Sequence, residues 1–271
     1  AAFEAFFTNL PATTGMAFVI VQHLDPTRES ILAELIQRYT IMPVAQVEDQ
    51  VQVQPNHVYV IPPDRNVALY RNRLLLLKPT EPRGQRLAVD YFFRTLADER
   101  RQDAIGIILS GTGSDGTAGI RVIKAEGGMV MVQAPETAAY GGMPGSAMNT
   151  HLVDYALPAA ELPAKLVAFV EHRRSVTQQQ AADLEDADDT FQKIMDMLQQ
   201  HTGHDFSQYK LNTLHRRVER RVALHYLDDI DAYAAVLQRD SAELDALFHE
   251  LLIGVTEFFR DPDFFDTLAK T

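Results

Sequence analysis

A histidine and an aspartate each follow a short apolar run, and together they could form part of a hydrolytic site. His23 comes just after the run 16–21, and Asp115 lies in a glycine-rich loop after the run 104–109. Both runs have the length of buried strands in a parallel sheet. Because ligands and catalytic groups gather at the carboxyl ends of parallel strands, we expect both side chains at one edge of the sheet. A histidine oriented by an acid is two thirds of a serine-hydrolase triad, and no serine precedes His23.

The loop 111–116 has three interpretations when its spacing is considered alone. Ser114 or Asp115 caps the helix that follows, Asp115 is a catalytic acid, or the free N–H groups of the helix start bind a phosphate. The glycines permit the tight turn that each interpretation needs. The phosphate hypothesis has the least support, because the loop does not match G-x-G-x-x-G in register and no P-loop lysine follows.

Composition excludes several classes of protein. The chain has 271 residues and no cysteine, which excludes disulfides, thiolate catalysis and cysteine-ligated zinc, and we predict no metal site. A net charge of -12 argues against binding to nucleic acid. No apolar run approaches the ~20 residues that span a bilayer, so we expect no membrane insertion. The absence of cysteine fits a reducing compartment, and we expect a cytoplasmic location.

Three regions follow one another along the chain. Residues 1–174 alternate strands and helices, which predicts an α/β fold with a doubly wound, mostly parallel sheet and an antiparallel hairpin insertion within 57–77. Residues 175–189 are strongly acidic and free of Gly and Pro, which indicates a solvated linker, either irregular or helical. Residues 190–271 form a small all-α domain, with helices predicted at 190–201, 209–224, 229–239 and 241–252 and after residue 261.

Several motifs of the first region resemble those of chemotaxis receptor methylesterase (CheB-type) domains. They are VQHLDP at 21–26, LSGTGSDG at 109–116, QAPE at 133–136 and GMPGSA at 142–147, with YVIPP at 59–63 and DYFF at 90–93. The resemblance covers residues 1–172 and implies that His23 is the triad histidine and Asp115 the triad aspartate. Thr112 stands where that family commonly has methionine beside the active site.

The same resemblance places the nucleophilic serine outside this chain. In that family the serine lies in a glycine-rich turn just before a helix, and residues 1–4 resemble the run after that turn. We therefore expect the serine upstream of Ala1 and regard the chain as truncated and inactive by itself. Ser110, Ser114 and Ser146 do not fit a nucleophile on a strand-to-helix turn before His23.

The reaction implied is hydrolysis of a γ-glutamyl methyl ester on a chemotaxis receptor helix, with glutamine deamidation as a further possibility. The serine would attack the ester carbonyl, His23 would take its proton and later activate water, and Asp115 would orient His23. This chemistry needs no cofactor. The implied partners are methyl-accepting chemotaxis receptors or similar signalling proteins.

The last region carries a basic helix and a second set of motifs. The helix 209–224 holds the cluster Arg216, Arg217, Arg220 and Arg221, which by itself is typical of a solvated face, and VTEFFRD stands at 255–261. Together they resemble the N-terminal helical region of chemotaxis receptor methyltransferases (CheR type). The resemblance implies S-adenosylmethionine contacts for Thr256 and Arg260 and receptor docking for the four arginines. Gly254 replaces a family asparagine, and without the main catalytic domain we expect no tight binding of S-adenosylmethionine.

The sequence therefore predicts a fragment of a fusion between a receptor methylesterase and a receptor methyltransferase, cut at both ends. A catalytically silent receptor-docking scaffold is the alternative, in which both regions bind receptor helices without chemistry.

Overall fold

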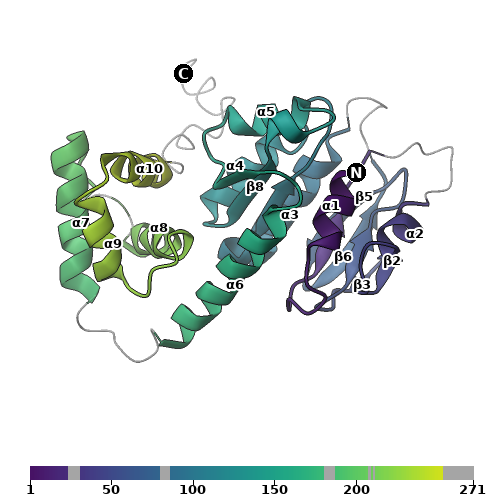
Figure 1. The fold of residues 1–271 in the computed structure, drawn as a ribbon, viewed down its shortest axis with the longest axis horizontal. Coiled ribbons are helices and arrows are strands. Elements are labelled where there is room, and N and C mark those ends of the chain that lie inside the picture. The colour runs from purple at the N-terminus through teal and green to yellow at the C-terminus, as the bar shows by residue number, and fades with distance from the viewer. Residues whose placement is uncertain (24–30, 80–85, 180–186, 207–208, 210, 253–271) are drawn as a thin grey trace, which may run out of the picture. The chain divides into compact units, whose positions relative to one another are not determined.

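The computed structural model describes residues 1–271 except 24–30, 80–85, 180–186, 207–208, 210 and 253–271. The chain forms two compact units, Ala1–Glu171 and His172–Thr271 (Figure 1). The first unit combines strands and helices, and the described part of the second is helical. The predicted fold class, α/β followed by a small all-α domain, is therefore confirmed.

Two three-stranded parallel sheets contain the predicted apolar strands. One has the order β1-β4-β2, with strands β1 (Phe18–Ile20), β4 (Val58–Val60) and β2 (Val44–Gln46). The other has the order β7-β8-β9, with strands β7 (Ile105–Ile108), β8 (Met129–Gln133) and β9 (Tyr155–Leu157). Among the described residues β1 pairs only with β4 and β7 only with β8, so the predicted single sheet is divided in two between β1 and β7.

The predicted antiparallel insertion is a sheet of its own. Its order is β3-β6-β5, with strands β3 (Val51–Gln52), β6 (Arg73–Leu77) and β5 (Asn66–Tyr70). The turn between β5 and β6 holds Arg71 and Asn72 at φ 47° and 59°, a left-handed conformation that a tight hairpin requires. The two-residue strand β3 has no counterpart in the sequence prediction.

In the described residues, six α-helices accompany these strands. They are α1 (Ala2–Thr8), α2 (Leu32–Gln37), α3 (Ala88–Arg100), α4 (Thr117–Ala125), α5 (Gly142–Met148) and α6 (Leu162–Gln179), with short 3-10 turns at 101–103 and 135–137. Helix α4 ends just before Gly127, which adopts φ 81°, and the Gly128 N–H donates to the Ile123 carbonyl at 2.8 Å.

One hydrophobic core joins all three sheets of the first unit. It contains Tyr59 from β4, Leu69 from β5 and Val130 from β8, and the α3 side chains Phe92 and Phe93 pack into it. Because the core is continuous, the carboxyl ends of β1 and β7 are held at fixed positions relative to each other.

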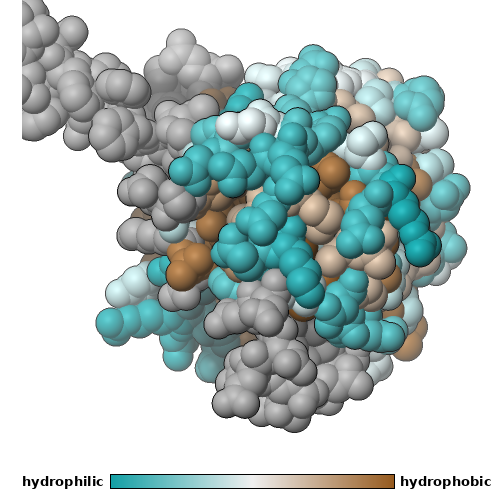
Figure 2. Space-filling view, turned by 90° about the vertical axis from the view of Figure 1, so that its left-hand side faces the viewer, coloured by the Kyte–Doolittle hydropathy of each residue, from teal (hydrophilic) through white to brown (hydrophobic). Residues whose placement is uncertain are grey.

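The second unit is built from α7 (Ala187–Thr202), α8 (Leu211–Leu224), α9 (Ile230–Leu237) and α10 (Ser241–Leu252). Its core includes Leu198, Leu214 and Tyr233. Asp229 begins α9, since its carboxylate accepts the Ala232 N–H at 2.7 Å. The face of this unit that carries α7 is mostly hydrophilic, with smaller hydrophobic areas between polar side chains (Figure 2).

The element bounds differ from the prediction around the acidic stretch. Helix α6 extends to Gln179, beyond residue 175, where the linker is predicted to start. Helix α7 begins at Ala187, before residue 189, where the linker is predicted to end. The helix predicted after residue 261 lies outside the described residues.

Candidate active site

The structure brings His23 and Asp115 into direct contact. His23 follows β1 and Asp115 follows β7, and His23 Nε2 lies 2.8 Å from Asp115 Oδ2. The His23 side chain is 48% exposed and the Asp115 side chain 5% exposed. The acid is therefore buried behind the histidine, which keeps a free edge toward solvent.

Four donors surround the Asp115 carboxylate. Oδ2 accepts the Val89 N–H at 3.0 Å besides facing His23, and Oδ1 accepts the N–H groups of Asp90 at 2.9 Å and Gly116 at 2.8 Å. Burial alone would raise the pKa of the Asp115 carboxyl. The hydrogen bonds from His23, Val89 and Asp90 outweigh burial, and the pKa lies below its ordinary value. Asp115 is therefore ionised at neutral pH.

The ionised carboxylate determines which ring nitrogen of His23 carries the proton. A carboxylate only accepts hydrogen bonds, so Nε2 of the neutral imidazole must be the donor to Asp115. Nδ1 then keeps its lone pair and is the basic atom. The pair thus has the arrangement of a general base held by an acid.

Contacts at the first turns of α3 and α4 distinguish among the three interpretations of the loop 111–116. Asp115 accepts N–H groups from the first turn of α3 and from Gly116, the residue before α4, so the interpretation in which it merely caps α4 is not supported. The cap of α4 comes from Asp90, whose Oδ1 accepts the Gly119 N–H at 2.6 Å. Two buried carboxylates at the start of α4 repel an anion, and the Gly116 and Gly119 N–H groups are engaged. These contacts count against the phosphate hypothesis.

Neighbouring segments hold the loop that leads to Asp115. Gln133 is buried, and its side chain accepts the Ser110 N–H and donates to the Thr137 carbonyl, both at 3.0 Å. The Gly111 N–H donates to the Tyr140 carbonyl at 2.9 Å. The motifs around residues 90 and 133 are visible in the sequence, but their roles are not, because Asp90 bonds Gly119 and Gln133 bonds Ser110, residues far apart in the chain.

The three serines considered earlier are placed as follows. Ser110 Oγ accepts the Tyr140 N–H at 2.9 Å, and Ser146 Oγ lies 3.4 Å from the Gly113 carbonyl. Ser114 is exposed on the same loop. Two of the three hydroxyls thus face backbone groups, and the hydrogen bond of His23 is made with Asp115, not with one of these serines.

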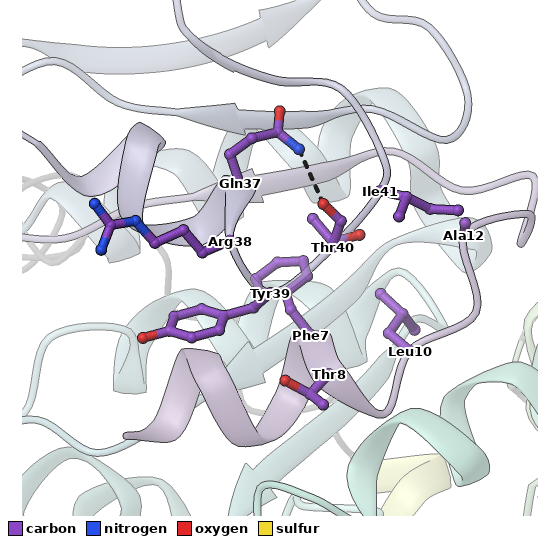
Figure 3. Close-up of a pocket in the computed structure, with 9 residues that line it drawn as sticks. All are labelled: Phe7, Thr8, Leu10, Ala12, Gln37, Arg38, Tyr39, Thr40 and Ile41. Atoms are coloured by element: carbon purple, nitrogen blue, oxygen red, sulfur yellow. Dashed lines mark hydrogen bonds between the residues drawn. The ribbon is translucent and has the colours of Figure 1, made fainter.

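A shallow cavity of about 400 Å³ lies elsewhere on the first unit, between the ends of α1 and α2 (Figure 3). Phe7, Leu10, Tyr39 and Ile41 line it, and a hydrogen bond of 2.9 Å joins the Gln37 side chain to the Thr40 carbonyl. None of its lining residues belongs to the histidine–aspartate pair, so the cavity does not mark the candidate site.

The arginines of the predicted docking cluster lie on α8, and two of them are buried. Arg217 is 3% exposed and donates to the Glu250 carbonyl, and Arg220 is 4% exposed and pairs with the Glu250 carboxylate at 2.5 Å. Arg216 is half-buried. Receptor docking by these side chains stays a prediction, and docking through Arg217 or Arg220 would require the Glu250 contacts to open.

Arg221 belongs to a second group of contacts. Its Nε donates to Glu243 at 2.7 Å, and the same carboxylate accepts the Tyr233 hydroxyl at 2.6 Å and lies 2.9 Å from His225 Nε2. This group joins α8, α9 and α10, so it contributes to the fold of the helical unit.

Thr256 and Arg260, the residues predicted to contact S-adenosylmethionine, lie outside the described residues. In the part of the chain that the structure describes, no group of three or more metal-ligating side chains is present. No helix of that part has the length and apolar character to cross a bilayer.

The fold and the pair define an α/β protein with a histidine–carboxylate site at the ends of two parallel strands. Comparison with known families identifies it further: the family model described as CheB methylesterase matches residues 1–166, and the chain belongs to that family. Residues 189–252 match the all-alpha domain of CheR methyltransferase.

Individual relatives match one or both of these regions. An uncharacterized 104.1 kDa protein of Rhodobacter capsulatus is 34% identical over 260 residues, covering 88% of this chain and 27% of that protein. A protein-glutamate methylesterase/protein-glutamine glutaminase of Thermotoga maritima is 32% identical over 171 residues, covering 62% of this chain and 50% of that protein. The match to the Rhodobacter capsulatus protein is longer than the first unit, which ends at Glu171, so it includes residues of both units. The chain spans half or less of the length of these relatives.

A solved structure supports the fold of the first unit. The CheB methylesterase catalytic domain of Thermotoga maritima is 30% identical, with a TM-score of 0.57 over 61% of this chain and 90% of that domain. The recognition of a methylesterase domain followed by the N-terminal domain of a methyltransferase is therefore confirmed.

Proposed function

We propose that the first unit is the base-and-acid part of a protein-glutamate methylesterase that acts on chemotaxis receptors, with glutaminase activity on the same site. The observation that carries the proposal is the 2.8 Å contact between His23 and an ionised, fully hydrogen-bonded Asp115. Among side chains, a histidine whose second nitrogen is held by a buried carboxylate is suited to move a proton to and from a nucleophile.

The proposed nucleophile is a serine upstream of Ala1. Its hydroxyl oxygen attacks the γ-glutamyl ester carbonyl, and His23 Nδ1 takes the hydroxyl proton. The tetrahedral intermediate collapses to an acyl-enzyme, and methanol leaves with the proton from His23. Water, deprotonated by His23, then releases glutamate and restores the serine. With glutamine in place of the ester, ammonia leaves instead of methanol.

The sheet topology supports this placement of the nucleophile. β1 and β7 are edge strands of two parallel sheets that share one core, and their carboxyl ends meet at the His23–Asp115 contact. A further parallel strand between them would bring the turn at its carboxyl end to the exposed edge of His23.

The second unit is proposed to be the N-terminal part of a protein-glutamate methyltransferase. In the complete enzyme Thr256 and Arg260 would help to bind S-adenosylmethionine, which supplies the methyl group, and none of the esterase chemistry passes through it. Receptor docking by the basic helix α8 would have to open the contacts that Arg217 and Arg220 make with Glu250. We further propose that the protein works in the cytoplasm, where receptor signalling domains are accessible.

The test is hydrolysis of methylated receptor by this chain and by a chain extended upstream through the serine. We expect methanol release only from the extended chain, and His23→Ala in that chain to lower kcat by a factor of at least about 10³. His57→Ala is the matched control, because the His57 side chain bonds the local Pro55 carbonyl and stacks on Tyr59, away from the His23–Asp115 pair. Silence of the folded extended chain would instead favour the receptor-docking scaffold.

A further inference from the structure

Asp90 is a buried acid that the proposed mechanism does not use. It lies in the first turn of α3 and is 3% exposed. Its backbone N–H donates to Asp115 Oδ1 at 2.9 Å, and its own Oδ1 accepts the Gly119 N–H at 2.6 Å. Asp90 therefore contacts both the acid of the site and the helix that follows that acid.

These contacts make a reciprocal pair of helix caps. Asp115, which precedes α4, accepts N–H groups from the first turn of α3, while Asp90, in α3, accepts one from the first turn of α4. A Cβ atom on Gly119 would lie 2.6 Å from Phe93 Cβ and 3.1 Å from Asp90 Cα, so the helices approach closely only because residue 119 is glycine. The two caps fix the two helix starts against each other.

The negative charge of Asp90 is unfavourable beside Asp115, and the need for a helix cap does not explain why residue 90 is charged. An asparagine oxygen would accept the Gly119 N–H equally well without placing a second carboxylate beside Asp115. Burial raises the pKa of the Asp90 carboxyl, the Gly119 N–H lowers it, and the charge of Asp115 raises it again. Among the described charged groups, Arg94 of α3 is the cation that offsets this repulsion. A second negative charge at this point does favour a protonated His23, which the proposed reaction forms.

We propose that Asp90 is a positioning residue that holds Asp115 Oδ2 toward His23 and adds its own negative charge to that of Asp115. The proposal rests on the proposed function for the role of His23 as the base. The contacts on which the proposal depends are present in this chain without the serine. The proposal can therefore be tested separately from ester hydrolysis.

The test is nuclear magnetic resonance of the 271-residue chain with ¹⁵N-labelled histidine, which reports the tautomer of His23 and the pH midpoint of its titration. Asp90→Asn keeps an oxygen for the Gly119 N–H and removes the charge. We expect the Nε2–H tautomer to persist and the midpoint to fall by more than about 0.2 pH units. Asp90→Ala also removes the cap, and we expect the same fall together with both tautomers.

Asp98→Asn is the matched control, because it removes the same charge from an exposed position eight residues further along α3, about 12 Å away. We expect it to leave the His23 midpoint and tautomer as in the wild type. A folded Asp90→Asn chain whose midpoint stays within about 0.2 pH units of wild type would overturn the proposal. So would a folded Asp90→Ala chain with a single tautomer. If Asp90→Ala does not fold, the Asp90→Asn result decides alone. An inactive extended chain with the expected His23 shifts would contradict the proposed function and leave this inference standing.

Discussion

Acid should destabilise the helical unit through one buried carboxyl, Glu243. Glu243 is buried on α10, and Arg221, Tyr233 and His225 all contact its two oxygens. Burial by itself would raise its pKa. The hydrogen bonds from His225 and Arg221, and the charge of Arg221, lower the pKa from 4.5 to about 2.

The direction of the pH effect follows from this lowered pKa. Between pH 4.5 and pH 2 the unfolded chain binds a proton at Glu243 that the folded unit does not bind, so acid favours unfolding. The stabilisation is fully present above pH 4.5 and is lost as the pH falls toward 2. A difference of that size corresponds to about 3 kcal/mol in the free energy of unfolding.

Hydrogen exchange followed by mass spectrometry is the appropriate assay, because it reads peptides of α8 and α10 in the full chain and the chain has no tryptophan. We expect wild-type protection of these peptides to fall from pH 6 to pH 3 after correction for intrinsic exchange. Glu243→Gln should be less protected at pH 6 and should lose most of the pH dependence. Asp228→Asn, at an exposed carboxyl of the same unit, is the control and should behave as wild type. Wild-type protection and pH dependence in Glu243→Gln would refute this account of the contacts.

Two further predictions concern buried contacts, one in each unit. Glu250→Leu leaves the buried Arg220 guanidinium without its carboxylate, and the unfolding midpoint of the helical unit should fall by about 10 °C or more. The double variant with Arg220→Met should recover most of the loss, and failure to recover would show that the lost ion pair is not the cause. Gly116→Ala should cost the first unit about 1–3 kcal/mol in urea unfolding, because Gly116 has φ 92° and a Cβ there would lie 2.9 Å from Ile108 Cδ1. Gly145→Ala, where no atom lies within 4 Å of the added Cβ, should cost much less, and equal costs would contradict the strain argument.

The contact between His23 and Asp115 could be predicted because it depends on sheet topology. Each residue follows an apolar run, and parallel strands deliver their carboxyl ends to one edge. What holds Asp115 could not be predicted in the same way. Its cap on α3 joins residues 25 and 26 positions apart, and the return cap from Asp90 to Gly119 spans 29. The capping rules that apply to sequence are local, so they offered only a cap on the following helix as the structural interpretation of Asp115.

The positions of the arginines on α8 could be read from the sequence, but the carboxylates that pair with them could not be identified from it. Leu214 and Val218 mark the apolar stripe, and Arg217 and Arg221 stand three and seven residues after Leu214, which places them beside that stripe. A buried guanidinium needs a carboxylate, and Glu243 and Glu250 of α10 stand seven residues apart on one helix face. Each half of the pairing is readable from helical spacing, but only tertiary packing shows that the two faces meet. A basic helix in an acidic protein is therefore as consistent with an internal ion-pair network as with a docking surface. On α8 the network accounts for Arg217, Arg220 and Arg221.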